Sequence, residues 1–177
     1  MATAHSGDSP QFTERKLLLC LHDLAGYARL AHHMPDREIA EFLNDYYALN
    51  VAAIKEAGGL VLKYMGDAVL SVFEPEHASE AVARMAQLAR DVVQLGEKRG
   101  AHIQSGCNMH VEQVVVGEFG PEGERRHDAI GKGMNHVHLM GRGPGLRISE
   151  PVYRSLPNDA RAAWDKVKPP AVYHFKG

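Results

Sequence analysis

Two aspartates stand where short apolar segments end, a placement that suits a metal or phosphate site. Asp23 follows the apolar run Leu17–Leu21, and Asp67 follows Gly66 between two further apolar runs. A short glycine-containing connection between β-rich segments predicts a hairpin, so Asp67 would be held at its tip. If these strands are neighbours, the two carboxylates converge, and their mutual repulsion favours a bound cation. Mg²⁺ takes carboxylate oxygens together with substrate phosphates and water, so this pair could hold it.

Each of these charged residues also has a purely structural interpretation. Asp67 could be only a turn former, and Asp23 only the N-cap of a following helix. Lys63 lies four residues before Asp67 and could act with it, or could simply extend its ammonium group from an apolar strand into solvent. Asp128 follows the charged stretch 125–127, and a solvated surface charge is its simplest interpretation.

Eleven histidines raise the question of a transition-metal site. The closest pairs are His32 with His33 and His136 with His138. Neither spacing puts two imidazoles on one face of a helix, which needs residues about three or four apart. We therefore expect these histidines to be solvated or part of the core. No Walker or Rossmann glycine motif and no G-x-S-x-G elbow occurs, so those nucleotide-binding folds and a hydrolase triad lack support.

Length and composition describe one ordinary globular domain. The chain has 177 residues, of which 45% are hydrophobic and 24% charged, enough for a sizeable core. A net charge of −2 and a pI near 6.6 argue against a nucleic-acid partner bound through bulk electrostatics. No apolar run approaches the roughly 20 residues of a membrane span and the N-terminus has no signal pattern, so we expect a cytoplasmic chain without a membrane segment. Cys20 and Cys107 lie in apolar segments, which predicts buried free thiols.

The candidate residues must be positioned by strands that end beside them. Residues 1–11 are small and polar and are expected to form a flexible tail, followed by a single domain over residues 12–177. The first strand is predicted within residues 12–24, and a helix begins at Gly26 and Tyr27. A strand-to-helix junction leaves backbone N–H groups pointing outward, so we expect Gly26 and Tyr27 to bind substrate phosphate.

Apolar periodicity predicts the other elements, beginning with a helix from Pro35 to the glycines at 58 and 59. The middle of the chain continues with hairpin strands Leu60–Met65 and Ala68–Phe73, a helix Glu76–Lys98, and two meander strands Ile103–Val111 and Gln113–Phe119. The last third continues with strand Ala129–Lys132, helix Met134–Met140, strand Leu146–Ser149, helical turn Glu150–Leu156, helix Asp159–Val167 and strand Ala171–Phe175. This order predicts an α+β fold: a ferredoxin-like βαββαβ core with an antiparallel-rich sheet, helices packed on one face, and a C-terminal α/β extension.

Several of these segments together resemble the class III adenylyl/guanylyl cyclase catalytic domain, or cyclase homology domain, in its bacterial form. Leu19–Tyr27 is similar to the first metal-binding segment of that family, and Lys63–Val69 matches its hairpin signature almost residue for residue. The resemblance runs from about Lys16 to Leu156. Further similar segments are the helix start at His77-Ala78, the strand and turn Val114–Gly120, and Asp128–Gly131 with Asn135.

The resemblance implies a role for the charged residues. Asp23 and Asp67, with the backbone carbonyl of Leu24, would hold two Mg²⁺ or Mn²⁺ ions per site. Lys63 and Asp128 would read the edge of adenine, because a donor beside an acceptor suits its ring nitrogen and exocyclic amine. Guanylyl cyclases of the family commonly carry Glu and Cys in place of this pair, so the resemblance favours ATP as substrate.

The resemblance also implies an activity and an assembly. The chain would be an adenylyl cyclase that converts ATP to 3′,5′-cyclic AMP and pyrophosphate in intracellular signalling, with Asn135 positioning the ribose and triphosphate. Members of the family form head-to-tail dimers with their sites at the interface. In a homodimer, one chain would supply the two aspartates, and its partner would supply Asn135 and the pair Lys63 and Asp128.

Three departures from the family pattern stand out. The family arginine four residues after the asparagine is replaced by Leu139, and the segment after Asn135 is a few residues shorter. Arg142, about one helical turn further on, is the candidate substitute. Glu112 takes the place of a glycine in a strand-turn-strand. Two alternatives therefore stay open: a catalytically weak or inactive nucleotide-binding regulatory module, and a cyclase for another nucleoside triphosphate.

Overall fold

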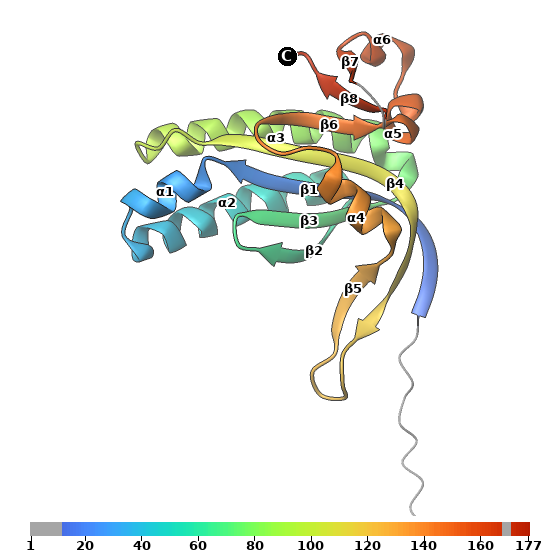
Figure 1. Ribbon diagram of the computed structural model, residues 1–177, viewed down its shortest axis with the longest axis horizontal. Helices are drawn as coiled ribbons and strands as arrows, with labels where there is room; N and C mark the ends of the chain where they lie inside the picture. The colour runs from blue at the N-terminus through green and yellow to red at the C-terminus, as the bar shows by residue number, and fades with distance from the viewer. Residues whose placement is uncertain (1–11, 168–170) are drawn as a thin grey trace, which may run out of the picture.

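The computed structural model of the chain describes residues 12–167 and 171–177, so the tail predicted for residues 1–11 lies outside the described residues. The first elements are β1 (Phe12–Ala25), α1 (Tyr27–His33), α2 (Asp36–Glu56), β2 (Leu60–Met65), β3 (Ala68–Phe73), α3 (Ala78–Lys98) and β4 (Gln104–Phe119). Their strands lie in the order β2-β3-β1-β4, and every neighbouring pair is antiparallel (Figure 1). This is the predicted ferredoxin-like βαββαβ core.

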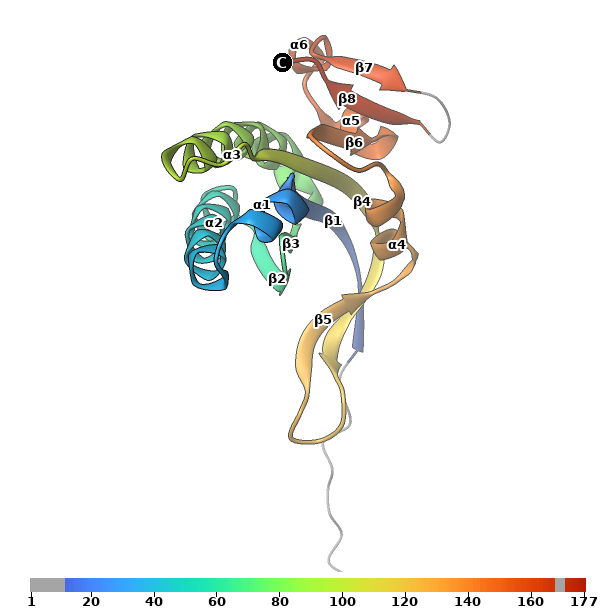
Figure 2. The ribbon, with the colours of Figure 1, turned by 60° about the vertical axis from the view of Figure 1, so that its left-hand side comes forward.

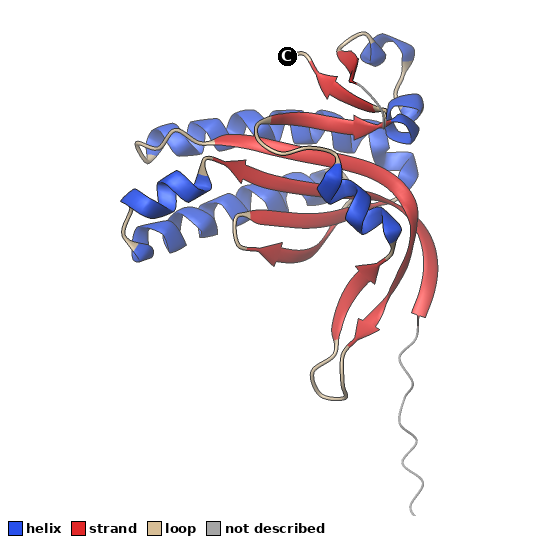
Figure 3. Cartoon of the chain, in the orientation of Figure 1, coloured by secondary structure: helices blue, strands red, loops and turns tan. Residues whose placement is uncertain are grey.

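The C-terminal third enlarges the same sheet to eight strands. The remaining elements are β5 (Arg126–Ile130), α4 (Lys132–Leu139), β6 (Gly145–Ser149), α5 (Glu150–Ser155), α6 (Asn158–Arg161), β7 (Trp164–Val167) and β8 (Val172–Phe175). β6 pairs with β4 in parallel, β8 and β7 follow it, and β5 pairs with the last residues of β4 to form an arm that extends from the sheet (Figure 3).

Helices cover both faces of the sheet, so the prediction that they share one face is wrong. On one face, Leu18 and Cys20 of β1 pack in a core with α2 and α3; on the other, Leu17 and Leu19 pack with α4 (Figure 2). A strand buried on both faces reads as a continuous apolar run instead of an alternating one. Cys20 is a buried free thiol, as predicted, and its Sγ lies 3.5 Å from that of Cys107, which is also free and buried.

The two meander strands predicted over residues 103–119 are one continuous strand. β4 pairs with β1 without a break from Phe12 opposite Gly117 to Ala25 opposite Gln104. Glu112 stands inside this ladder, and no described non-glycine residue has a positive φ. Pairing with the long strand β1 therefore keeps β4 extended at Glu112, where the sequence predicts a turn.

The helix predicted over Asp159–Val167 is also wrong in its second half. α6 ends at Arg161, and Trp164 begins β7, which pairs with β8. The Trp164 side chain is buried and packs on Phe175, so tertiary pairing outweighs the local helical pattern. The other predicted elements have the right type, with ends that differ by a few residues. Among the described helices, none is long and apolar enough to cross a membrane.

Candidate active site

The hairpin turn docks against the end of β1, and this brings the two aspartates together. Asp23 stands opposite Ala68 in the β1–β3 ladder, and the Leu24 amide donates to the Asp67 carbonyl at 3.2 Å. Gly66 takes a left-handed conformation, with φ of 64°, that glycine adopts without strain. The hydroxyl of Tyr47 donates to the Gly66 carbonyl and anchors the turn from α2.

The electrostatics of Asp23 reflect this placement. Burial raises the pKa of Asp23, the carboxylate of Asp67 raises it further, and the cations of Arg147 and Arg142 act in the opposite direction. Two carboxylates that repel each other fit a divalent cation, since the cation removes the repulsion. The described residues contain no group of three or more His, Cys, Asp or Glu that could hold a metal. A cation here would therefore complete its shell with the Leu24 carbonyl, substrate phosphates and water.

Gly106 makes room for the Asp23 carboxylate, a role that no pattern in the sequence predicts. Gly106 stands opposite Asp23 on β4. A Cβ on Gly106 would lie 2.1 Å from Asp23 Oδ1 and 2.6 Å from the Gly143 carbonyl oxygen. No side chain fits there, so the carboxylate lies across the bare strand toward the loop that contains Gly143.

Arg147 of β6, which the sequence does not predict as a site residue either, is buried and holds that loop by hydrogen bonds. Its side chain is 5% exposed and donates to Asn108 Oδ1 at 3.3 Å and to the carbonyls of four consecutive residues, 142–145, at 2.8–3.3 Å. Asn108 in turn donates to the Val137 and Gly141 carbonyls, each at 2.9 Å. The only available signal in the sequence was a charged residue inside the apolar segment Leu146–Ser149.

Arg142 does not lie on a further turn of α4, as the helical spacing had implied. The helix ends at Leu139, and Arg142 lies in the loop before β6 with an exposed side chain. Among the residues that the structure describes, its guanidinium has no hydrogen bond or ion pair. The Arg142 guanidinium is close enough to Asp23 of the same chain to lower the pKa of that carboxyl.

Directly behind Asp23, a buried polar network holds the end of β1. The ring of His22, 1% exposed, contacts Asn50 Oδ1 through Nδ1 at 2.8 Å and Ser105 Oγ through Nε2. The Tyr46 hydroxyl donates to the His22 carbonyl at 3.0 Å. Burial lowers the pKa of His22 to about 4, against the smaller opposing effect of its bond to Asn50. The imidazole is therefore neutral at pH 7, a core histidine of the expected kind.

Lys63 and Asp128 form the second predicted grouping. Lys63 Nζ donates to Asp128 Oδ2 at 2.6 Å, and Asp128 Oδ1 accepts from the Ala129 amide at 2.8 Å. The two side chains are 37% and 28% exposed, so the pair is open on one side. Lys63 lies on β2 and Asp128 on β5, and the two form an ion pair. The simpler interpretation, in which each is a separate solvated charge, is therefore wrong.

The predicted residues of α4 stay at the surface. Asn135 is exposed, and Leu139, at the position of the family arginine, is 84% exposed. His136 stacks on His110 of β4, with ring centroids 4.0 Å apart, and His110 lies 3.6 Å from Glu112. This pairing across two elements could not be expected from the spacing of His136 and His138.

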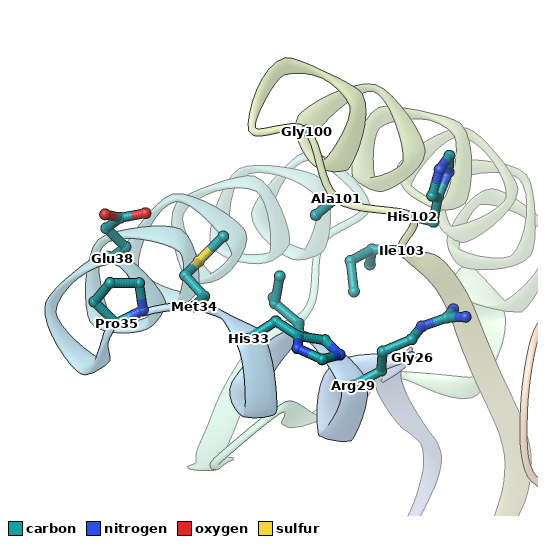
Figure 4. Close-up of a pocket in the computed structure, with 11 residues that line it drawn as sticks. Gly26, Arg29, His33, Met34, Pro35, Glu38, Gly100, Ala101, His102 and Ile103 are labelled. Carbon is teal, nitrogen blue, oxygen red and sulfur yellow. The ribbon is translucent and has the colours of Figure 1, made fainter.

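Gly26 and Tyr27 mark the junction of β1 and α1, as predicted. Gly26 has φ of 101° and is the N-cap of α1. On the side of this junction that faces α2 and the start of β4 lies a cavity of about 370 Å³, lined by Arg29, His33 and Ile103 among others (Figure 4). Neither aspartate lines this cavity, so it is separate from the paired carboxylates.

Comparisons of sequence and fold place this chain in a family. No protein-family model matches the chain. A protein named adenylate cyclase from Anabaena cylindrica is 33% identical over an alignment of 155 positions, and the match covers 80% of this chain and 31% of that protein. The chain thus spans less than a third of the length of this curated relative and of others that it matches.

Two solved structures have the same fold. The adenylyl cyclase CyaB from P. aeruginosa superposes with a TM-score of 0.82 at 16% identity, over 93% of this chain and 95% of that one. The guanylyl cyclase Cya2 superposes with a TM-score of 0.79 at 20% identity, over 92% of each chain. With the sequence relationship to the Anabaena protein, these likenesses identify the described residues as a cyclase homology domain of the class III adenylyl/guanylyl cyclase family.

Proposed function

We propose that this chain is a nucleotidyl cyclase that converts ATP to 3′,5′-cyclic AMP and pyrophosphate for intracellular signalling. The observation that carries the proposal is the convergence of Asp23 and Asp67 at the docked hairpin turn. In the reaction, the ribose 3′-oxygen attacks the α-phosphorus and loses its proton to solvent, and the bond from that phosphorus to the pyrophosphate oxygen breaks, so that pyrophosphate leaves.

Asp23, Asp67 and the Leu24 carbonyl would hold two Mg²⁺ or Mn²⁺ ions. Such ions, when bound, favour the ionised 3′-oxygen and neutralise charge on the departing pyrophosphate. Asp23 would be ready for this role because Gly106 leaves its carboxylate unhindered. Gly26 and Tyr27, at the start of α1, would contact the phosphates through their backbone N–H groups.

The pair Lys63 and Asp128 would select the base. Its ammonium can donate to a ring nitrogen of adenine and its carboxylate can accept from the exocyclic amine, while guanine presents the opposite pattern. The 2.6 Å contact means that both groups are already held together before a base arrives. The name of the Anabaena relative, adenylate cyclase, supports the same choice of substrate.

A homodimer would complete two equivalent sites. In the head-to-tail arrangement implied by the family, the aspartates of one chain meet Lys63, Asp128 and Asn135 of the other. Asn135 would position the ribose and triphosphate, which its exposed place on α4 permits. Arg142 is proposed as a catalytic cation in place of the family arginine.

The exposed, apolar Leu139 is the observation that favours a second candidate, a weak or inactive regulatory module. The loss of one group that stabilises transition-state charge costs on the order of 10²–10³ in rate. Purified chain with Mn²⁺ and each nucleoside triphosphate in turn, with cyclic product identified by mass spectrometry, separates the candidates. Cyclic product from ATP that is absent with Asp67→Ala supports an adenylyl cyclase. Cyclic product from a different nucleotide, and none from ATP, would mean that the chain is a cyclase for that other substrate. Nucleotide binding without any cyclic product would establish the regulatory module instead.

A further inference from the structure

A loop anchored beside Asp23 carries a cation that has no partner among the described residues. The segment 141–145, here called the loop, leads from α4 into β6, whose first residue is Gly145, and crosses in front of β4 (Figure 1). One level of the sheet holds Asp23 on β1, Gly106 on β4 and Gly145 on β6. Adjacent strands lie about 4.8 Å apart, so the end of the loop stands two strand spacings from Asp23.

The Asp23 carboxylate reaches toward this loop. Asp23 Oδ1 and the Gly143 carbonyl oxygen lie 2.1 and 2.6 Å from the same point, the position of a Cβ on Gly106, so at most 4.7 Å separates the two oxygens. Arg142 immediately precedes Gly143 in this segment. Its guanidinium can therefore reach a ligand that is bound at Asp23 of the same chain.

The backbone of the loop is held in place at every carbonyl. Arg147 donates to the carbonyls of residues 142–145, and Asn108 donates to that of Gly141. A buried guanidinium has five N–H donors in a fixed fork, which suits this fan of acceptors. Arg147 has no carboxylate within ion-pair distance in the described part of the chain, so its charge is compensated by the loop carbonyls, by Asn108 and, at longer range, by the Asp23 carboxylate, whose pKa it lowers.

We propose that Arg142 binds the phosphate chain of the nucleotide at the Asp23 and Asp67 site of its own chain, and that Arg147 is the positioning residue that holds it there. This inference rests on the proposed function. An exposed guanidinium beside paired carboxylates matches a ligand that has both a divalent cation and phosphate oxygens, which arginine binds in bidentate fashion. In the proposed dimer, Arg142 thus acts from the same chain as the aspartates, whereas Asn135 acts on the site of the partner.

The first test measures binding of inorganic tripolyphosphate with Mn²⁺ by isothermal titration calorimetry. Loss of charged hydrogen bonds in Arg142→Ala should weaken binding roughly tenfold to hundredfold, with Arg142→Lys in between. Arg37→Ala, which removes an exposed arginine on α2, should bind like wild type. Arg147→Lys keeps the charge but loses the fork, so it should weaken binding and speed hydrogen exchange of the loop amides. Unchanged binding in Arg142→Ala overturns the inference, and this exposed variant does not depend on the stability of Arg147 variants.

The second test decides which chain Arg142 serves. A heterodimer of an Asp67→Ala chain and an Arg142→Ala chain, purified through two different tags, should have no tight tripolyphosphate site. One tight site per heterodimer would mean that Arg142 serves the partner and would overturn the inference. Asp67→Ala paired with wild type should keep one tight site in either case. If the chain is a monomer, the first test alone decides, because only the same chain is then present.

The two proposals can fail separately. Cyclic AMP production together with unchanged tripolyphosphate binding in Arg142→Ala overturns the role of Arg142 and leaves the cyclase standing. Weakened binding in Arg142→Ala together with no cyclic product from any nucleotide supports the role of Arg142 and overturns the cyclase.

Discussion

The buried ring of His22 should make the fold sensitive to acid. Burial lowers its pKa in the folded chain to about 4, whereas the unfolded chain has the ordinary value of 6.5. Between these two pH values, the unfolded chain binds a proton at His22 and the folded chain does not, so stability falls as pH falls. At about 1.4 kcal/mol for each pH unit, the free energy of unfolding should drop by about 2–3 kcal/mol between pH 7 and pH 4.5.

The assay is urea unfolding, followed by circular dichroism at these two pH values and at one protein concentration. With a urea dependence of about 2 kcal/mol per M, the wild-type midpoint should move down by about 1 M more than that of His22→Gln, which does not titrate. His110 and His174, whose pKa values burial also lowers, act in the same direction, and Asp23, whose pKa is raised, acts in the opposite one; all three are common to both proteins. His32→Gln, at an exposed position, is the matched control and should follow wild type. Equal pH dependence in wild type and His22→Gln would refute the reasoning.

Three other substitutions test the site. Gly106→Ala places a methyl carbon 2.1 Å from the present position of Asp23 Oδ1, so Mn²⁺ affinity measured by electron paramagnetic resonance should fall at least about tenfold; wild-type affinity would show that the carboxylate is free to move away. Lys63→Glu with Asp128→Cys, the pair common in guanylyl cyclases of the family, should shift the ratio of kcat/KM values for ATP and GTP toward GTP by at least about tenfold; an unchanged ratio would remove this pair from base recognition. Leu139→Arg should change the free energy of unfolding by no more than about 0.5 kcal/mol, because the position is exposed, and should raise turnover by on the order of 10². Unchanged turnover would mean that another group already performs the role of the family arginine.

Local chemistry explains why the hairpin could be predicted to the residue. Leu60–Met65 and Ala68–Phe73 are set by apolar runs and a glycine turn, all within fifteen residues of one another. The single strand β4 could not be predicted, because its continuity depends on a partner about ninety residues earlier in the chain. The same holds for Trp164, whose strand exists only because β8 pairs with it.

The site divides in the same way. The sequence predicts Asp23 and Asp67 because each stands at the end of a visible apolar run. Gly106 and Arg147 could not be found, since their importance comes from register across three strands: Gly106 lies between Asp23 and Gly145, and Arg147 folds back onto the loop before it. The resemblance to the cyclase family implies roles only for positions that match the family pattern, and it implies none where the chain departs from that pattern, as at Leu139.

The most direct test of the central claim is a crystal structure of the chain with Mn²⁺ and a non-reactive ATP analogue, with the metals located by anomalous scattering. We predict two Mn²⁺ ions about 3.5–4 Å apart, both bound by the carboxylates of Asp23 and Asp67, with phosphate oxygens completing their shells. Mn²⁺ bound elsewhere, or a nucleotide bound with both aspartates free of metal, would contradict the account.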